Sequence, residues 1–220
     1  RAESERDLAF AVNASSVLRL ADQARKIDAL LVHFSTDYVF DGEKKLPYVE
    51  SDPSGPLNVY GESKLAGERA VAASGCRHFI FRTSWVYGPG GRNFLVAILA
   101  AAKAGRELRV VNDQHGAPTS SEDIARALAG MLSSSDFLRK PNGIYHLSAA
   151  GGTTWYEFAR QILARKGLRT PVEPVSSAQY PAPARRPKNS LLDNGKLRAT
   201  FGVALEDWRA GLAAVLGAVH

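Results

Sequence analysis

Apolar residues in the first third of the chain follow two kinds of pattern, helical spacing and short continuous runs. Apolar side chains at positions 8, 12, 17, 18, 20 and 21 predict a helix over Leu8–Arg25. The next run, Ala29–Phe34, is short and almost entirely apolar, which is typical of a strand buried on both faces of a parallel sheet. A loop rich in Gly, Pro, Asp and Ser follows over Asp41–Pro56. A second helix is predicted over Tyr60–Ala73, with Gly75 just past its end.

The alternation of strands and helices continues to the end of the chain. Strands are predicted at His78–Thr83, Leu108–Val111, Gly143–Leu147 and inside the loop Pro171–Pro187, and helices at Asn93–Ala104, 119–132, Thr154–Lys166, Asn194–Phe201 and Glu206–Leu216. Two of these helices begin with the spacing of a capping box, Thr119 with Glu122 and Thr154 with Glu157. Strands that alternate with helices predict an α/β fold with a Rossmann-like, doubly wound parallel sheet.

Polar residues follow the first two predicted strands at the point where each strand ends. Ser35-Thr36-Asp37 follows the first strand, and Thr83-Ser84-Trp85 follows the second. Parallel sheets bind their ligands at the carboxyl ends of the strands. The sequence therefore predicts the functional site at this edge of the sheet.

Composition excludes several classes of protein. The 220 residues are 45% hydrophobic and 23% charged, as in an ordinary soluble globular protein and unlike a disordered tail, a fibre or a coiled coil. The longest apolar run, Val96–Ala102, is far shorter than the roughly 20 residues that cross a membrane. The net charge of +6 comes from scattered Lys and Arg, so no nucleic-acid partner is expected. The single cysteine, Cys76, cannot form an internal disulfide, which favours the cytoplasm.

Tyr60 and Lys64 are candidates for acid–base chemistry because they lie four residues apart at the start of a predicted helix and share one face. A neighbouring ammonium lowers the pKa of a phenol and eases proton exchange with a carbonyl or an alcohol. The pair alone is a weak signal, since a solvated helix face gives the same spacing. Thr36, at the end of the preceding strand, adds a hydroxyl that could reach the same carbonyl oxygen.

Six strings of sequence, in order along the chain, resemble one enzyme family. They are HFSTDYVFDG (33–42), PLNVYGESKLAGE (56–68), FRTSWVYG (81–88), NDQHGAPT (112–119), GIYHLSAAGGTTWYEFA (143–159) and YPAPARRPKNSLLD (180–193). The chain resembles the extended short-chain dehydrogenase/reductases, and within them the dTDP-4-dehydrorhamnose reductases. This resemblance implies that NADPH or NADH reduces the C4 ketone of a dTDP-linked 4-keto-6-deoxy sugar. The product would be dTDP-L-rhamnose, made in the last step of its biosynthesis and used in carbohydrates such as lipopolysaccharide.

The same resemblance implies roles for five residues. Tyr60 would donate the proton to the C4 oxygen, and Lys64 would hold the nicotinamide ribose and tune Tyr60. Thr36 would bind the reacting carbonyl, with Asp37 beside it. Trp85 would pack on the sugar. Thr36, Tyr60 and Lys64 are thus the expected catalytic residues, and Tyr60 and Lys64 the expected cofactor contacts.

Other candidates are more ambiguous. Arg185 and Arg186 could pair with the diphosphate of the substrate, and the family resemblance favours Arg186 as a substrate contact; an exposed proline-rich loop is the alternative. His115 could be an acid or a ligand, but no second His or Cys lies at metal-ligand spacing, which favours an ordinary loop residue. Trp155 and Trp208 are expected to be packing residues.

Some features of the family are not recognisable in this chain. The family begins with a strand, a glycine-rich turn and a helix that hold the cofactor pyrophosphate, and residues 1–30 supply none of them. We therefore expect several strand–helix units to precede Arg1. Some members bind Mg²⁺ through acidic residues at a dimer interface. Glu122 matches one such position, but Arg209 occupies another, so a metal-bridged homodimer is not favoured and no metal is assigned.

The expected domain division follows the family. Residues 1–88 and 116–150 would belong to the dinucleotide-binding domain, and residues 89–115 and 151–220 to the smaller, C-terminal substrate-binding region. Two other functions stay open. An epimerase or dehydratase of the same fold is disfavoured because Tyr38, and no acidic residue, follows Asp37. A non-catalytic regulatory subunit, like the one that binds methionine adenosyltransferase, is disfavoured by the intact set of Thr36, Tyr60 and Lys64.

Overall fold

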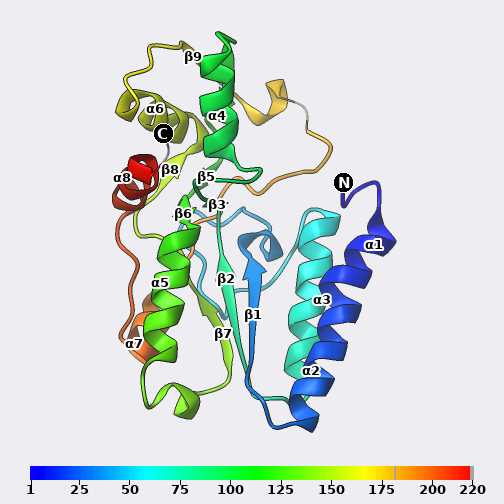
Figure 1. The fold of residues 1–220 in the computed structure, drawn as a ribbon. Helices are drawn as coiled ribbons and strands as arrows, with labels where there is room; N and C mark the ends of the chain where they lie inside the picture. Colours follow the sequence, from blue (N-terminus) through cyan, green and yellow to red (C-terminus); the bar gives the residue numbers. More distant parts are fainter. Residues whose placement is uncertain (181, 219–220) are drawn as a thin grey trace.

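A three-stranded parallel sheet lies at the centre of the computed structural model, which describes residues 1–180 and 182–218. β2 (His78–Thr83) lies between β1 (Leu31–Thr36) and β7 (Gly143–His146) (Figure 1). The register aligns Thr36 with Thr83, so the two polar strand ends lie side by side as predicted. The α/β fold with a parallel sheet is therefore confirmed.

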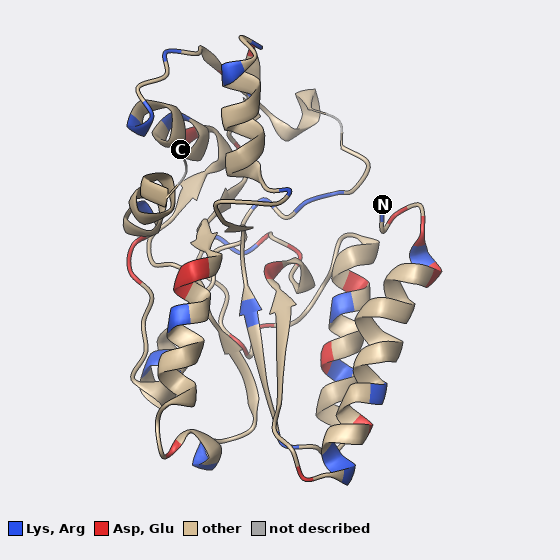
Figure 2. Cartoon of the chain, viewed as in Figure 1, with Lys and Arg blue, Asp and Glu red and all other residues tan. Residues whose placement is uncertain are grey.

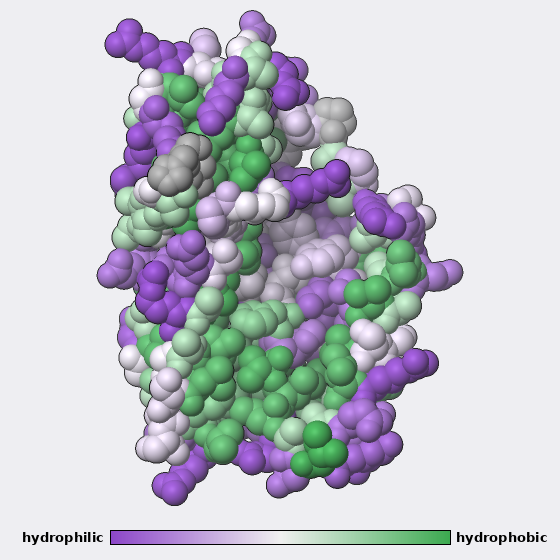
Figure 3. All heavy atoms as spheres, viewed as in Figure 1, coloured by the Kyte–Doolittle hydropathy of each residue, from purple (hydrophilic) through white to green (hydrophobic). Residues whose placement is uncertain are grey.

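The burial of β1 differs from the prediction. β2 is buried over its first five residues, whereas the first four residues of β1 are only half buried. Among the described residues β1 has one neighbouring strand, β2, and forms an edge of the sheet. A short apolar run does not distinguish a central strand from an edge strand. Figure 3 shows apolar side chains gathered in front of the sheet, between α3 and α5.

The helices that precede and follow β1 pack side by side on one flank of the sheet (Figure 1). α1 (Arg6–Phe10), the π-helical η1 (Ala11–Ser15) and α2 (Ser16–Lys26) form one continuous helical run, which confirms the predicted helix. This run packs against α3 (Val59–Ala73). A Cβ on Gly67 would lie 2.1 Å from the Asn13 carbonyl oxygen, so the close approach of these helices requires glycine there.

The opposite flank of the sheet is covered by α5 (Ser121–Leu132) and α7 (Gly195–Phe201). Buried aromatic residues of β2 and β7, including Phe79, Phe81 and Tyr145, form the core there. The expected cap of α5 is wrong by one residue. The Ser120 hydroxyl accepts from the Glu122 and Asp123 amides, while the Thr119 hydroxyl donates to the Ala117 carbonyl oxygen and accepts from the Ala149 amide.

A second hydrophobic core lies above the carboxyl ends of the strands. It is built by α4 (Phe94–Lys103), α6 (Trp155–Arg165) and α8 (Trp208–Ala218) with the parallel pair β4 (Leu108–Val111) and β9 (Val172–Val175). The amide of Glu157 donates to the Thr154 hydroxyl at the start of α6, as the capping pattern predicts.

Short strand pairs and 3₁₀ turns connect the larger elements. β3 (Val86–Tyr87) pairs with β6 (Thr119–Ser120) and β5 (His115–Gly116) with β8 (Thr153–Thr154), and the 3₁₀ turns are η2 (Asp37–Val39), η3 (Phe137–Arg139) and η4 (Ser177–Gln179). Lys and Arg are interspersed with Asp and Glu along the helices (Figure 2). None of the helices among the described residues is long and apolar enough to cross a membrane.

Candidate active site

Three predicted catalytic residues meet at the carboxyl end of β1. Thr36 is the last residue of the strand, and its hydroxyl donates to Asp37 Oδ1 at 3.1 Å. Tyr60 lies in the first turn of α3, and Lys64 lies one turn later on the same face. Lys64 Nζ donates to the Phe34 carbonyl oxygen at 2.6 Å, which fixes the ammonium against the end of β1. The structure thus brings the hydroxyl, the phenol and the ammonium together.

The start of α3 is pressed against the turn that follows β1. A Cβ on Gly61 would lie 2.2 Å from the Tyr38 carbonyl oxygen, so only glycine allows this approach. The rings of Tyr38 and Tyr60 meet edge to face, with centroids 5.9 Å apart. Tyr60 is nevertheless 39% exposed, so a ligand at the strand ends can reach it.

Partial burial of the Tyr60 side chain has the largest effect on the pKa of its phenol. It raises the pKa of Tyr60, the negative charge of Asp37 raises it further, and a hydrogen bond with the Thr36 hydroxyl lowers it. The sequence-based expectation that Lys64 lowers this pKa is therefore not met, because Lys64 is directed at the Phe34 carbonyl group. Burial lowers the pKa of Lys64 itself, while the carboxylate of Glu68 raises it. A phenol with a raised pKa holds its proton at neutral pH.

Asp37 is a buried carboxyl group, only 3% exposed. Burial raises its pKa to about 7, although the hydroxyls of Ser190 and Thr36 act in the opposite direction. Asp37 therefore changes charge near neutral pH, next to Thr36 and Tyr60.

A buried ion pair fixes α3 on the sheet. Arg82, on β2, donates from Nε and Nη2 to the two carboxylate oxygens of Glu68, at 2.9 and 2.6 Å. Both side chains are almost fully buried. Glu68 lies one helical turn beyond Lys64, so this pair holds the face of α3 that carries Lys64 against β2.

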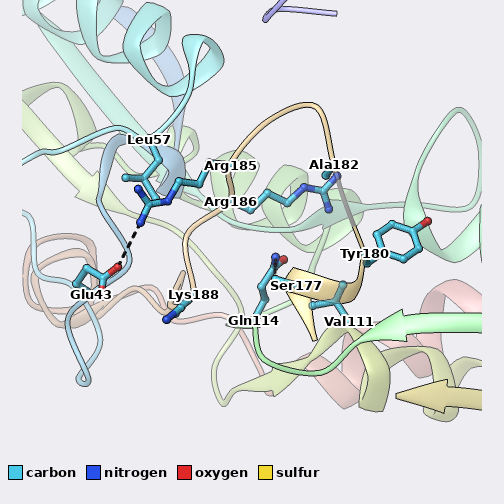
Figure 4. Close-up of a pocket in the computed structure, with 10 residues that line it drawn as sticks. All are labelled: Glu43, Leu57, Val111, Gln114, Ser177, Tyr180, Ala182, Arg185, Arg186 and Lys188. Carbon is cyan, nitrogen blue, oxygen red and sulfur yellow. Dashed lines mark hydrogen bonds and ion pairs between the residues drawn. The ribbon is translucent and has the colours of Figure 1, made fainter. Parts of the chain in front are cut away.

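A cleft lined by basic residues opens beside this site. Its lining residues come from four segments of the chain and are Glu43, Leu57, Val111, Gln114, Ser177, Tyr180, Ala182, Arg185, Arg186 and Lys188 (Figure 4). The Arg185 side chain is turned towards Glu43, at 3.9 Å, whereas Arg186 extends to the other side of the cleft, towards Ala182. The charge of Arg186 lowers the pKa of Tyr38, which burial and Asp37 raise to about 12. A charge in the cleft therefore acts on Tyr38, whose ring contacts that of Tyr60.

Comparisons with known proteins show the family to which the chain belongs. The family described as RmlD substrate binding domain matches residues 1–220. The chain is 44% identical to the dTDP-4-dehydrorhamnose reductase of Escherichia coli K12 and 47% identical to that of Sinorhizobium fredii; the alignments cover 98% and 94% of this chain and 74% and 72% of those relatives. The chain belongs to the dTDP-4-dehydrorhamnose reductase family.

A solved member of this reductase family has the same fold. The crystal structure of dTDP-4-dehydrorhamnose reductase from Bacillus anthracis in complex with NADP superposes with a TM-score of 0.93 at 36% identity. The superposition covers 99% of this chain and 76% of that one.

Polar groups at the carboxyl ends of β1 and β2 are suited to bind the nicotinamide-ribose end of NADP. Ser35 Oγ and Thr83 Oγ1 are buried and have no hydrogen-bond partner among the described residues, and Lys64 keeps two N–H donors besides the one given to Phe34. These groups can bind ribose hydroxyls or a carboxamide. The sequence contains no turn with the G-x-G-x-x-G spacing that binds a pyrophosphate, so the fit concerns the reacting end alone.

Trp85 and the other tryptophans lie above this edge. Trp85 is 9% exposed and stacks on Trp155 with ring centroids 3.6 Å apart, and a Cβ on Gly116 would lie 2.3 Å from its indole. Trp208 is buried in the upper core, as expected. His115 is exposed; its backbone amide donates to the Lys188 carbonyl oxygen, and its carbonyl oxygen accepts from the Ser190 amide.

The two positions considered for Mg²⁺ are occupied by Glu122 and Arg209. No group of three His, Cys, Asp or Glu side chains that could hold a metal occurs in residues 1–180 and 182–218. Arg209 pairs with Asp207 at 3.1 Å.

Sequence reasoning missed Asn58, Gly61 and the Glu68–Arg82 pair. Asn58 could have been found, because Asn directly before a predicted helix is a preferred N-cap. The close approach at Gly61 and the ion pair have no local signal, since each depends on a segment far away in the sequence.

Proposed function

We propose that this chain reduces the C4 ketone of dTDP-4-dehydro-L-rhamnose to dTDP-L-rhamnose with NADPH or NADH, as the last step of dTDP-rhamnose biosynthesis. The observation that carries the proposal is the meeting of Thr36, Tyr60 and Lys64 at the carboxyl end of β1 in a member of this reductase family. The intact set favours a catalyst over a regulatory subunit. The lone Cys76 supports a cytoplasmic location.

In the proposed mechanism, Tyr60 Oη donates its proton to the C4 oxygen. The reduced nicotinamide cofactor supplies the hydride to C4 when bound. Burial keeps the phenol protonated until the carbonyl oxygen gains negative charge. The Lys64 ammonium, held by the Phe34 carbonyl oxygen, would bind the nicotinamide ribose with its remaining N–H donors. The Thr36 hydroxyl, at the same strand end, orients the carbonyl oxygen.

We assign the substrate to the edge above these residues. Arg186, in the cleft, would bind the diphosphate through its guanidinium fork. Asp37 and Trp85 would contact the sugar through the small part of each side chain that reaches the surface, 3% and 9%. Residues 1–88 and 116–150 would form the cofactor side of the site, and residues 89–115 and 151–220 the substrate side. The two hydrophobic cores support this division for α4, α6 and α8, whereas Leu197 of α7 packs in the core of the central sheet.

Replacement of the proton donor tests this function. In the intact protein, Tyr60→Phe keeps the ring and removes the acid, so kcat for NADPH oxidation with the 4-keto sugar nucleotide should fall by about 10²-fold or more. Substrate KM should change little. Tyr156→Phe, a half-buried tyrosine on α6, is the matched control and should keep normal turnover. Near-normal turnover of Tyr60→Phe would contradict the proposed role.

A further inference from the structure

Asn58 holds two distant segments at once. As the N-cap of α3, it accepts a hydrogen bond at Oδ1 from the Gly61 amide at 2.8 Å. Its Nδ2 donates to the carbonyl oxygen of Arg185 at 2.8 Å, 127 residues further along the chain. The residue is only 4% exposed, so water does not compete well for either bond.

These two segments carry different halves of the proposed site. Tyr60 lies two residues after Asn58, in the first turn of α3. Arg186 directly follows the carbonyl group that Asn58 binds, and it lines the basic cleft (Figure 4). The hydrogen bond from Asn58 to Arg185 therefore links the backbone beside the proton donor to the backbone beside the diphosphate contact.

We propose that Asn58 is a positioning residue that fixes the arginine loop 182–188 on the catalytic helix and thereby sets the affinity for the sugar nucleotide. This inference rests on the proposed function, in which Arg186 binds the diphosphate. A loop that is already held in place does not lose conformational entropy when the substrate binds. Without the bond, that entropy is lost on binding and appears as a higher KM.

The capping and tethering roles can be separated by mutation. Asn58→Ser and Asn58→Asp keep an oxygen that accepts from the Gly61 amide, because Ser and Asp are good N-caps. Both remove the N–H donor to Arg185. Glu3 Oε1 also accepts from the Val59 amide at 2.8 Å, so the start of α3 keeps a second support in both variants. Both variants should therefore fold, which thermal unfolding would verify.

Asn93 provides a control, because it caps another helix in the same way and donates to carbonyl groups of the adjacent loop. As N-cap of α4 it accepts from the Val96 amide at 3.1 Å and donates to the carbonyl oxygens of Gly88 and Gly90 at 3.0 and 2.9 Å. Asn93→Ser loses an equivalent tether on a loop that does not carry Arg186. Its KM values should equal those of the wild type.

The experiment measures kcat and both KM values in the intact protein, with dTDP-4-dehydro-L-rhamnose and NADPH as substrates. We expect Asn58→Ser to raise the KM for the sugar nucleotide about five- to tenfold, with kcat within twofold and the KM for NADPH unchanged. Asn58→Asp should raise this KM at least as much, because its carboxylate would face the Arg185 carbonyl oxygen. A fall in kcat with an unchanged sugar KM would overturn the inference, because it would show a purely helical role.

A double-mutant cycle with Arg186→Ala distinguishes this inference from the proposed function. If Asn58 acts through Arg186, Asn58→Ser should have almost no further effect on the sugar KM once Arg186 is gone. Effects that simply multiply would overturn the coupling while leaving the function intact. A normal sugar KM in Arg186→Ala would instead contradict the proposed diphosphate contact, and with it the basis of the inference.

Discussion

At the scale of single residues, Asp37 is a carboxyl group whose surroundings disfavour its charge. Its pKa lies near 7 in the folded chain, against an ordinary value of 3.8, mainly because it is buried. The folded state therefore binds this proton more tightly than the unfolded state does. The stability that the protonated carboxyl contributes is complete below about pH 4 and is lost as pH rises towards 7.

Asp37→Asn should remove the loss of stability that the wild type suffers as pH rises. One pKa unit corresponds to about 1.4 kcal/mol, so between pH 4 and pH 8 the wild type should lose on the order of 4 kcal/mol of unfolding free energy relative to the variant. Urea unfolding of both proteins at several pH values measures the difference. His33 and His146, whose pKa values burial lowers to about 4 and about 3, contribute equally to both proteins and cancel. A difference that does not vary with pH would show that Asp37 titrates normally.

Residues near Tyr60 also show where sequence reasoning stops. The Tyr60–Lys64 spacing correctly predicted a shared helix face, because four residues make about one turn. It did not predict the raised pKa of Tyr60, because burial and the Asp37 carboxylate come from other segments of the chain. The contact between Asn58 and Arg185 was missed for the same reason, since no local pattern relates positions 127 residues apart.

At the scale of elements, the ion pair between α3 and β2 is the main polar link under the active site. Glu68→Gln would leave the Arg82 guanidinium buried without its carboxylate partner. The free energy of unfolding should fall by about 3–5 kcal/mol, as measured by urea titration. Because α3 carries Lys64, reductase activity should fall as well.

An exposed pair of the same residue types is the control for this prediction. Arg160 and Glu157 pair at 3.1 Å on α6, with both side chains about half exposed. Glu157→Gln should change the unfolding free energy by less than about 1 kcal/mol. The double variant Glu68→Leu/Arg82→Met should recover part of the loss, since no charge stays buried. Equal costs for Glu68→Gln and Glu157→Gln would mean that the α3–β2 pair is solvated.

The elements themselves were largely predictable because the sequence marks their ends. α3 was expected at Tyr60–Ala73 and occupies Val59–Ala73, followed by Gly75 with a positive φ of 74°. β2 and β4 match the predicted residues. The edge position of β1 and the true cap of α5 were not predictable, since both depend on which neighbours the strand and the turn find in three dimensions.

At the scale of the whole molecule, the segment 188–194 crosses between the two cores and binds the loop 41–56. Asn189 donates from Nδ2 to the carbonyl oxygens of Lys44 and Leu46 at 2.8 and 3.1 Å, and accepts from the Leu191 amide. The Tyr48 amide donates to the Leu191 carbonyl oxygen at 2.8 Å. The loop that follows β1 is thus held by residues from the far end of the chain.

Asn189→Ala should loosen this connection. Two carbonyl groups lose their donor, at a cost of about 1–3 kcal/mol in unfolding free energy. Amide hydrogen exchange should accelerate at Tyr48 and its neighbours, and much less in β2, because the opening is local. Unchanged exchange at Tyr48 would show that the backbone pairing alone holds the loop.

Two glycines of α3, Gly61 and Gly67, restrict which substitutions the helix can accept. Gly61 and Gly67 lie six residues apart and flank Lys64, and neither carries an atom that could take part in the chemistry. At each, an added methyl group would meet a carbonyl oxygen at 2.2 or 2.1 Å. In a saturation library under selection for activity, both positions would be as intolerant of change as Tyr60. A position of this helix can therefore be intolerant of substitution because space is short or because its side chain takes part in the reaction. Chemical rescue or pH profiles distinguish the steric cause from the catalytic one.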